Sequence, residues 1–119
     1  MLNLDTHVLL FALTDQLKPK ERALLARETW CIASIVLWEI SKLAQLGRVA
    51  LDVNDRELNR TLSSIHTWPL TWEVCRVIPG LDFRGDPADE IIAATSIVHG
   101  IPLLTRDRAI RRSRSVPLA

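Results

Sequence analysis

Two short runs decide the fold, Met1-Leu2-Asn3-Leu4-Asp5 and Pro102-Leu103-Leu104-Thr105-Arg106-Asp107. Each is an apolar stretch that ends at a carboxylate, as a buried strand does where it enters a polar loop. Between them, short apolar runs alternate with helical stretches, which predicts an α/β fold with a mainly parallel sheet. Because parallel strands end at the same edge of a sheet, we expect Asp5 and Asp107 to lie close together.

The other expected elements fill the interval between these runs. Asp86-Pro87-Ala88-Asp89 is the clearest helix start, with an Asp cap, a proline in the first turn and an acid two residues later. Strands are expected over residues 1–4, 29–32, 65–70, 102–105 and 116–118. Helices are expected over residues 6–13, from 18 onward, and over 34–46, 54–64, 71–78, 86–99 and 106–112.

Composition favours one globular domain over residues 1–119. Apolar residues make up 48% of the 119 residues, and 15 basic against 14 acidic residues give a net charge of +1. This balance provides no general attraction for nucleic acid, so a nucleic-acid function requires a local site. Two cysteines without a C-x-x-C pair exclude a disulfide scaffold and a thiolate zinc site. With no signal peptide or membrane span recognised, we expect a cytoplasmic protein.

Five acidic residues adjoin apolar segments that should be packed: Asp5, Glu39, Asp86, Asp89 and Asp107. Carboxylates beside a core are costly unless they are paired or bound to a cation. Oxygen ligands without a histidine or cysteine pattern select Mg²⁺ or Mn²⁺. Such a site suits phosphodiester hydrolysis, in which one or two ions polarise a phosphoryl oxygen and activate water.

Each acid also has a purely structural interpretation. Asp5, Asp86 and Asp107 suit helix caps or turns, and Asp89 suits the positive end of a helix dipole. Glu39 has Lys42 three residues along its expected helix, a pair that would stabilise the helix by about 0.2–0.5 kcal/mol. The presence of all five acids together supports a metal site more strongly than any one of them does.

Four stretches resemble the motifs of the PIN domain, specifically the VapC-type toxin ribonucleases of toxin–antitoxin modules. They stand in the family's order and extend from one end of the chain to the other. The stretches are Leu4-Asp5-Thr6-His7, Ser34 to Ile40 with Trp38-Glu39, Asp86-Pro87-Ala88-Asp89 with Ile91-Ile92-Ala93-Ala94, and Leu104-Thr105-Arg106-Asp107.

The resemblance implies a Rossmann-like three-layer α/β/α sandwich and a Mg²⁺- or Mn²⁺-dependent endoribonuclease. It also implies a homodimer and a cognate antitoxin that holds the enzyme inactive. By motif position, the metal-binding and catalytic acids are Asp5, Glu39, Asp89 and Asp107. The supporting residues are Asp86, Thr6 and Thr105, and Ser34 opens the helix of the second motif.

The chain departs from the family pattern in three places. The interval 11–29 is short, Glu90 replaces a more usual basic or neutral residue, and the tail after Asp107 is rich in arginine and lacks an aromatic residue. Arg106 and Arg108, which flank the last acid, are candidates for holding RNA phosphates. A solvated face or an antitoxin contact is the alternative role for this basic cluster.

The aromatic and histidine residues have structural interpretations by default. The four tryptophans, Trp30, Trp38, Trp68 and Trp72, are expected to fill the core or an interface rather than to stack on bases. His7 is expected to form structural hydrogen bonds.

Two other functions compete with the nuclease. One is a non-catalytic module that keeps the PIN fold and binds a partner protein. The other is a phosphatase with Asp5 as nucleophile, although His7 occupies the place where such enzymes usually carry a second aspartate.

Overall fold

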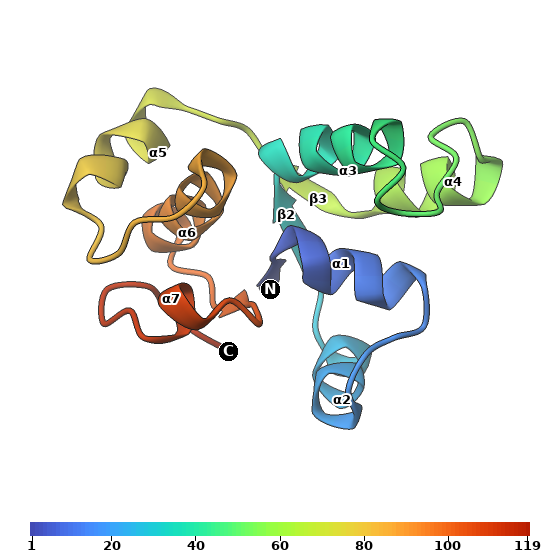
Figure 1. Ribbon diagram of the computed structural model, residues 1–119. Helices are drawn as coiled ribbons and strands as arrows, with labels where there is room; N and C mark the ends of the chain where they lie inside the picture. Colours follow the sequence, from blue (N-terminus) through green and yellow to red (C-terminus); the bar gives the residue numbers. More distant parts are fainter.

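A computed structural model describes all residues, 1–119, as four strands surrounded by helices (Figure 1). The strands are β1 (Leu2–Leu4), β2 (Trp30–Ala33), β3 (His66–Trp68) and β4 (Leu103–Leu104). The helices are α1 (Thr6–Leu13), α2 (Pro19–Arg27), α3 (Ile35–Gln45), α4 (Arg56–Ser64), α5 (Trp72–Val77), α6 (Pro87–His99) and α7 (Arg108–Arg111), with a 3₁₀ turn η1 (Ile78–Gly80) after α5.

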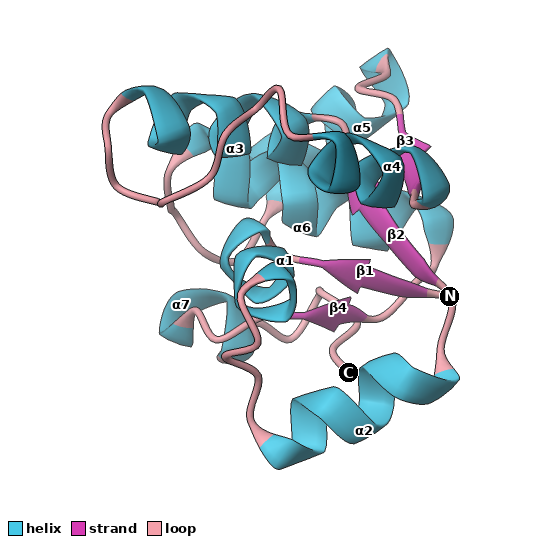
Figure 2. Ribbon diagram, turned by 90° about the vertical axis from the view of Figure 1, so that its right-hand side faces the viewer, coloured by secondary structure: helices cyan, strands magenta, loops and turns pink.

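The four strands form one sheet in the order β3-β2-β1-β4, and every neighbouring pair is parallel (Figure 2). This confirms the expected α/β class. The chain first moves outward from β1 through β2 to β3 and then returns to place β4 on the other side of β1. The strand order therefore reverses between β1 and β4, and ligands of open parallel sheets bind beyond the carboxyl ends of the strands at such a point.

Helices cover both faces of the sheet. In Figure 1, α5 and α6 lie on one side of the strands, whereas α1 and α4 lie on the other. Strand β1 is buried along its whole length, as expected for a central strand covered on both faces. Its Asn3 amide donates to the Ile92 carbonyl at 3.3 Å and to Ser96 Oγ at 2.9 Å, and these bonds tie β1 to α6.

The helix boundaries follow local signals in the sequence. Asp55, Thr71 and Asp107 cap α4, α5 and α7, each by accepting a hydrogen bond from the backbone amide three residues later. Gly100 ends α6 with a φ of 63°, a left-handed conformation that glycine adopts without a steric penalty.

Three expectations need correction. The last expected strand, 116–118, makes only a single parallel bridge between Leu103 and Leu118, because the chain runs alongside β4 for too few residues to extend a ladder. The expected strand 65–70 is reduced to β3, which ends before Pro69 because proline has no amide hydrogen to donate. Trp38 and Trp72 are not core residues, since they are 59% and 76% exposed.

No helix is both long and apolar enough to cross a membrane.

Truncation of Ile92 tests whether α6 is anchored on the sheet by its buried face. This side chain is fully buried in the main hydrophobic cluster. We expect Ile92→Ala to lower the free energy of unfolding by about 2–5 kcal/mol in chemical denaturation, because the truncation leaves a cavity. Leu46→Ala, at a side chain that is 55% exposed, is the control and should change stability by less than about 0.5 kcal/mol. Equal losses in the two variants would contradict this packing.

Candidate active site

Asp5 lies directly after β1 and is held by both of its carboxylate oxygens. The Thr6 amide donates to Oδ1 at 2.8 Å, and the Thr105 hydroxyl donates to Oδ2 at 2.5 Å. The residue is only 5% exposed. Asp5 is thus the N-cap of α1, as its structural interpretation required, and it is also linked across the sheet to the end of β4.

Thr105 connects the first acid to the last. While its hydroxyl donates to Asp5, its oxygen accepts a hydrogen bond from the Asp107 amide at 3.0 Å. Asp107 Oδ1 in turn accepts from the Ile110 amide at 3.0 Å and caps α7. Asp107 is half-buried and keeps its other oxygen free of protein hydrogen bonds. The sheet therefore brings Asp5 and Asp107 into one polar network, as expected.

Glu39 joins the site from α3. Its Oε1 accepts a hydrogen bond from the hydroxyl of Thr6, which is itself buried at the start of α1. The alternative partner, Lys42, donates instead to Gln45 Oε1 at 2.9 Å, and no ion pair joins Glu39 to Lys42. The structure therefore favours a role for Glu39 in the site over a helix-stabilising pair.

Asp86 and Asp89 belong to the start of α6. Asp86 occupies the N-cap position, but its side chain is exposed and makes no capping hydrogen bond. Asp89 is half-buried, and the backbone of Gly85 approaches it so closely that a Cβ there would lie 3.5 Å from Asp89 Oδ2. Asp86 therefore stands at the expected N-cap position without capping the helix through its side chain, and its carboxylate oxygens make no capping hydrogen bond.

The pKa shifts of Asp89 and Asp5 reflect both their burial and the negative charges of the neighbouring acids. Burial raises the pKa of Asp89 to about 6, with further upward shifts from the negative charges of Asp5, Asp107, Glu39 and Asp86. Burial also raises the pKa of Asp5, with a smaller contribution from Asp107, against the lowering effect of its hydrogen bonds. No lysine or arginine forms an ion pair with any of these acids. The site holds an excess of negative charge.

The donor set fits a hard divalent cation. Carboxylate and hydroxyl oxygens are the ligands that Mg²⁺ and Mn²⁺ prefer, and an uncompensated acidic cluster is stabilised by a positive ion. In the observed conformation, no three acidic, histidine or cysteine side chains are spaced to hold an ion among them. The structure thus gathers the acids without arranging them as a finished coordination sphere.

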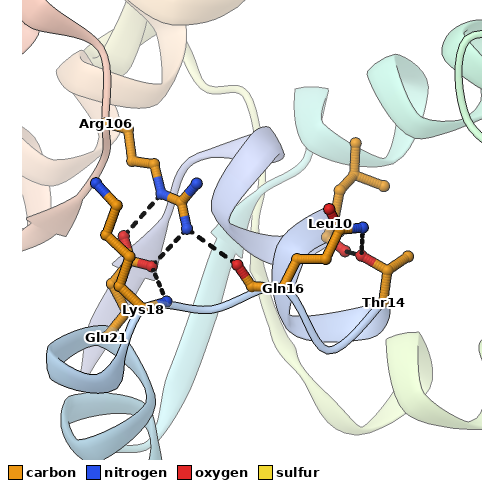
Figure 3. A network of polar contacts seen from close by, with 6 residues as sticks. All are labelled: Leu10, Thr14, Gln16, Lys18, Glu21 and Arg106. Carbon is orange, nitrogen blue, oxygen red and sulfur yellow. Dashed lines mark hydrogen bonds and ion pairs between the residues drawn. The ribbon is translucent and has the colours of Figure 1, made fainter.

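Arg106 has a different place from the one expected for an RNA contact (Figure 3). Its guanidinium donates from Nε to Glu21 Oε2 at 2.9 Å and from Nη2 to Glu21 Oε1 at 2.7 Å. Nη2 also reaches the Gln16 carbonyl at 3.2 Å, and Cζ lies 3.9 Å from the centre of the Phe11 ring. Through these contacts of Nε and Nη2, Arg106 joins the β4–α7 loop to α1 and α2.

The Arg106–Glu21 contact was missed by sequence reasoning. Its only signal is local: Glu21 also accepts from the Lys18 amide at 2.8 Å as part of a capping box at the start of α2. The hydrogen bond from Arg106 lowers the pKa of Glu21. Arg108, the other predicted RNA contact, is exposed and forms no ion pair within the protein.

A second unanticipated contact holds the C-terminal tail. Asp82 accepts hydrogen bonds from Ser113 Oγ at 2.6 Å, the Arg114 amide at 2.7 Å and Ser115 Oγ at 3.0 Å. These bonds lower the pKa of Asp82 to about 2. His7, expected to form structural hydrogen bonds, is exposed and makes none.

Comparisons with known proteins show what this chain is similar to. The model of the PIN domain matches residues 3–115. Ribonuclease VapC22 of Mycobacterium tuberculosis is 35% identical over 86 residues, which cover 70% of this chain and 66% of that protein. The match therefore spans just under two thirds of the relative's length.

Solved structures share the fold at lower identity. VapBC2 from Rickettsia felis, bound to a DNA fragment from its promoter, superposes with a TM-score of 0.75 at 19% identity, covering 100% of this chain and 98% of that one. FitAcB from Neisseria gonorrhoeae superposes with a TM-score of 0.67 at 24% identity, covering 99% and 96%.

Neutralising Asp89 should stabilise the metal-free protein. A carboxyl with a raised pKa binds protons more readily in the folded state, so stability falls as the pH rises from the ordinary 3.8 through about 6. At pH 7 we expect Asp89→Asn to increase the free energy of unfolding by about 1–2 kcal/mol, after allowance for partial exposure. The gain should shrink below pH 6 and vanish below pH 4.

The measurement is chemical denaturation with EDTA present, from pH 4 to pH 8. Glu57→Gln is the control, since it removes a carboxylate that is 78% exposed and far from the cluster in sequence. A pH-independent effect of Asp89→Asn would show that the negative charges do not interact.

Removing the Arg106 ion pair should destabilise the fold. Glu21 and Arg106 side chains are only 10% and 27% exposed, so we expect Glu21→Gln to cost about 1–3 kcal/mol at pH 7. Because the pKa of Glu21 is lowered, its contribution is present above the ordinary value of 4.5 and is lost as the pH falls below it.

The control is Asp15→Asn, which breaks an exposed pair with Arg22 between the end of α1 and α2. It should change the free energy of unfolding by less than about 1 kcal/mol. If Glu21→Gln costs no more than this control across the pH range, the ion pair does not hold the β4–α7 loop.

Proposed function

The chain belongs to the PIN-domain family, and from this premise we propose that it is a metal-dependent endoribonuclease, the toxin of a toxin–antitoxin pair. The observation that carries the proposal is the gathering of Asp5, Glu39, Asp89 and Asp107. They come from the end of β1, from α3, from α6 and from the loop after β4, and none of them forms an ion pair within the protein.

We assign these four acids as ligands of Mg²⁺ or Mn²⁺. When bound, the ion polarises a phosphoryl oxygen and makes the attacking water more acidic. One of the four carboxylates also orients or deprotonates the attacking water. Thr6 and Thr105 support the site by donating hydrogen bonds to Glu39 and Asp5, which fixes the direction of each carboxylate.

The residues at this site do not favour the phosphatase alternative. Phosphatases of that type usually carry a second aspartate two residues after the nucleophile, and His7 occupies that place here.

We further infer the biological setting from the relatives. The structures from Rickettsia felis and Salmonella typhimurium are titled as VapBC bound to DNA, and the Klebsiella pneumoniae structure as a toxin–antitoxin complex. On this basis we assign the chain a cognate antitoxin as partner and RNA as substrate. We propose homodimerisation from the family resemblance, and a cytoplasmic location because two sparse, free cysteines fit a reducing compartment. Arg108, exposed next to Asp107, remains the proposed contact for an RNA phosphate.

The decisive experiment is RNA cleavage by the purified protein with Mn²⁺ and with EDTA. We expect cleavage only with the ion, and a loss of at least about 100-fold in Asp5→Asn and in Asp89→Asn, since each removes a ligand. Calorimetry should show Mn²⁺ binding to the wild type and none to Asp89→Asn.

Glu57→Gln is again the matched control, because it removes one negative charge at an exposed position of α4. It should leave both cleavage and Mn²⁺ binding unchanged. Full cleavage by a folded Asp5→Asn/Asp89→Asn double variant would refute the nuclease, and Mn²⁺ binding without cleavage of any RNA would favour the non-catalytic module.

A further inference from the structure

A cleft of about 470 Å³ adjoins the acidic site on the side of α3 and α6. Its lining residues are Ile35, Trp38, Glu39, Asp86, Pro87 and Ala88. Glu39 belongs to both the cleft and the proposed metal site, so a molecule in the cleft lies against the groups that would cleave RNA.

The exposure of the Trp38 side chain in this cleft is not explained by packing within the protein. Two of the other tryptophans have partners within the protein: Trp30 Nε1 donates to the Leu25 carbonyl at 2.8 Å, and Trp68 stacks on His99 with the ring centres 3.8 Å apart. Trp38 makes no hydrogen bond or ring contact and is 59% exposed. An exposed indole contributes little to folding, whereas its flat face is suited to stacking.

The charges of the cleft restrict what it can bind. The lining includes two carboxylates, Glu39 and Asp86, and no basic residue, which disfavours a phosphate or an acidic peptide. Asp86 is exposed and makes no capping hydrogen bond, so its oxygens can accept from a ligand. Among the parts of an RNA chain, only a base offers both an uncharged flat face and amino groups that donate to carboxylates.

We propose that this cleft holds an unstacked base of single-stranded RNA beside the cleaved phosphodiester, with the Trp38 indole as its stacking surface and Asp86 as the acceptor for its amino group. This assignment rests on the proposed ribonuclease function and adds the residues that bind one base of the substrate. A base held within a duplex is stacked on both faces and cannot enter the cleft.

The test compares Trp38→Ala, Trp38→Phe and Trp72→Ala on a single-stranded RNA that contains a bond the wild type cleaves. Stacking of one base contributes about 1–3 kcal/mol, so Trp38→Ala should raise KM about 5- to 150-fold while kcat changes less than about threefold. Trp38→Phe should recover most of the affinity. Trp72, which is 76% exposed on α5, is the matched control, and its removal should leave KM unchanged.

An abasic nucleotide placed in turn on each side of the cleaved bond identifies the bound base. At one position it should raise KM of the wild type but have no further effect in Trp38→Ala, because the partner of the base is already missing. Asp86→Asn should alter the ranking of the four bases at that position. Mn²⁺ affinity measured by calorimetry should be the same in Trp38→Ala and wild type.

An unchanged KM in Trp38→Ala, or an equal penalty from each abasic position in both proteins, would overturn the base site and leave the nuclease standing. If Trp38→Ala also shifts the protein from dimer to monomer in sedimentation, the indole belongs to a contact between copies. Should the wild type cleave no RNA, the proposed function fails, and the cleft is judged by equilibrium binding of a single-stranded RNA that contains all four bases. If the base site exists, Trp38→Ala must weaken that binding.

Discussion

Repulsion between carboxylates at one edge of the sheet is the constraint around which this molecule is built. Burial raises the pKa of Asp89 to about 6, and the negative charges of Asp5, Asp107, Glu39 and Asp86, none of which is in an ion pair, add to that shift. Such a cluster destabilises a fold in the absence of a positive ion. Under the proposed function, the cluster is retained because the reaction needs negative charge there, and a bound divalent cation would offset its cost.

Neighbouring contacts keep the charged groups in place despite this repulsion. The Thr105 hydroxyl links Asp5 to the amide of Asp107, and the loop between β4 and α7 is anchored from outside by Arg106 on Glu21. Successive side chains of this loop point in different directions: Thr105 contacts the acids, and Arg106 contacts Glu21 of α2. A loop held on both sides can present Asp107 in a fixed direction, which is what a metal ligand requires.

The acidic site and the cleft beside it divide recognition between charge and stacking. In the proposed function, the acids bind a cation, and the cation contacts the phosphodiester. The cleft carries the exposed indole of Trp38 and suits a base. Because Glu39 lies at their boundary, a base in the cleft positions its own phosphate near the acids. An exposed indole adds little to the stability of a domain, and in this proposal the exposed face of Trp38 binds the base.

Much of the fold could be predicted from local patterns. Apolar runs that end at Asp5 and Asp107 indicated two parallel strands with their ends together, because strand direction and burial depend on short stretches of sequence. The start of α6 at Asp86-Pro87 and its end at Gly100 follow equally from capping and backbone rules. The identity of the acidic residues was likewise visible in the chain itself.

Only the tertiary structure decided the partners and the exposure of individual side chains. Arg106 pairs with Glu21 across 85 residues, and Asp82 holds a tail 31 residues or more away. Trp38 is exposed to solvent, whereas Trp68 stacks on His99. The residues next to each tryptophan in the sequence do not predict this difference. The physical reason is that local sequence sets backbone preferences and burial periodicity, whereas the partner of a long side chain depends on which distant segment folding brings within a few ångströms of it.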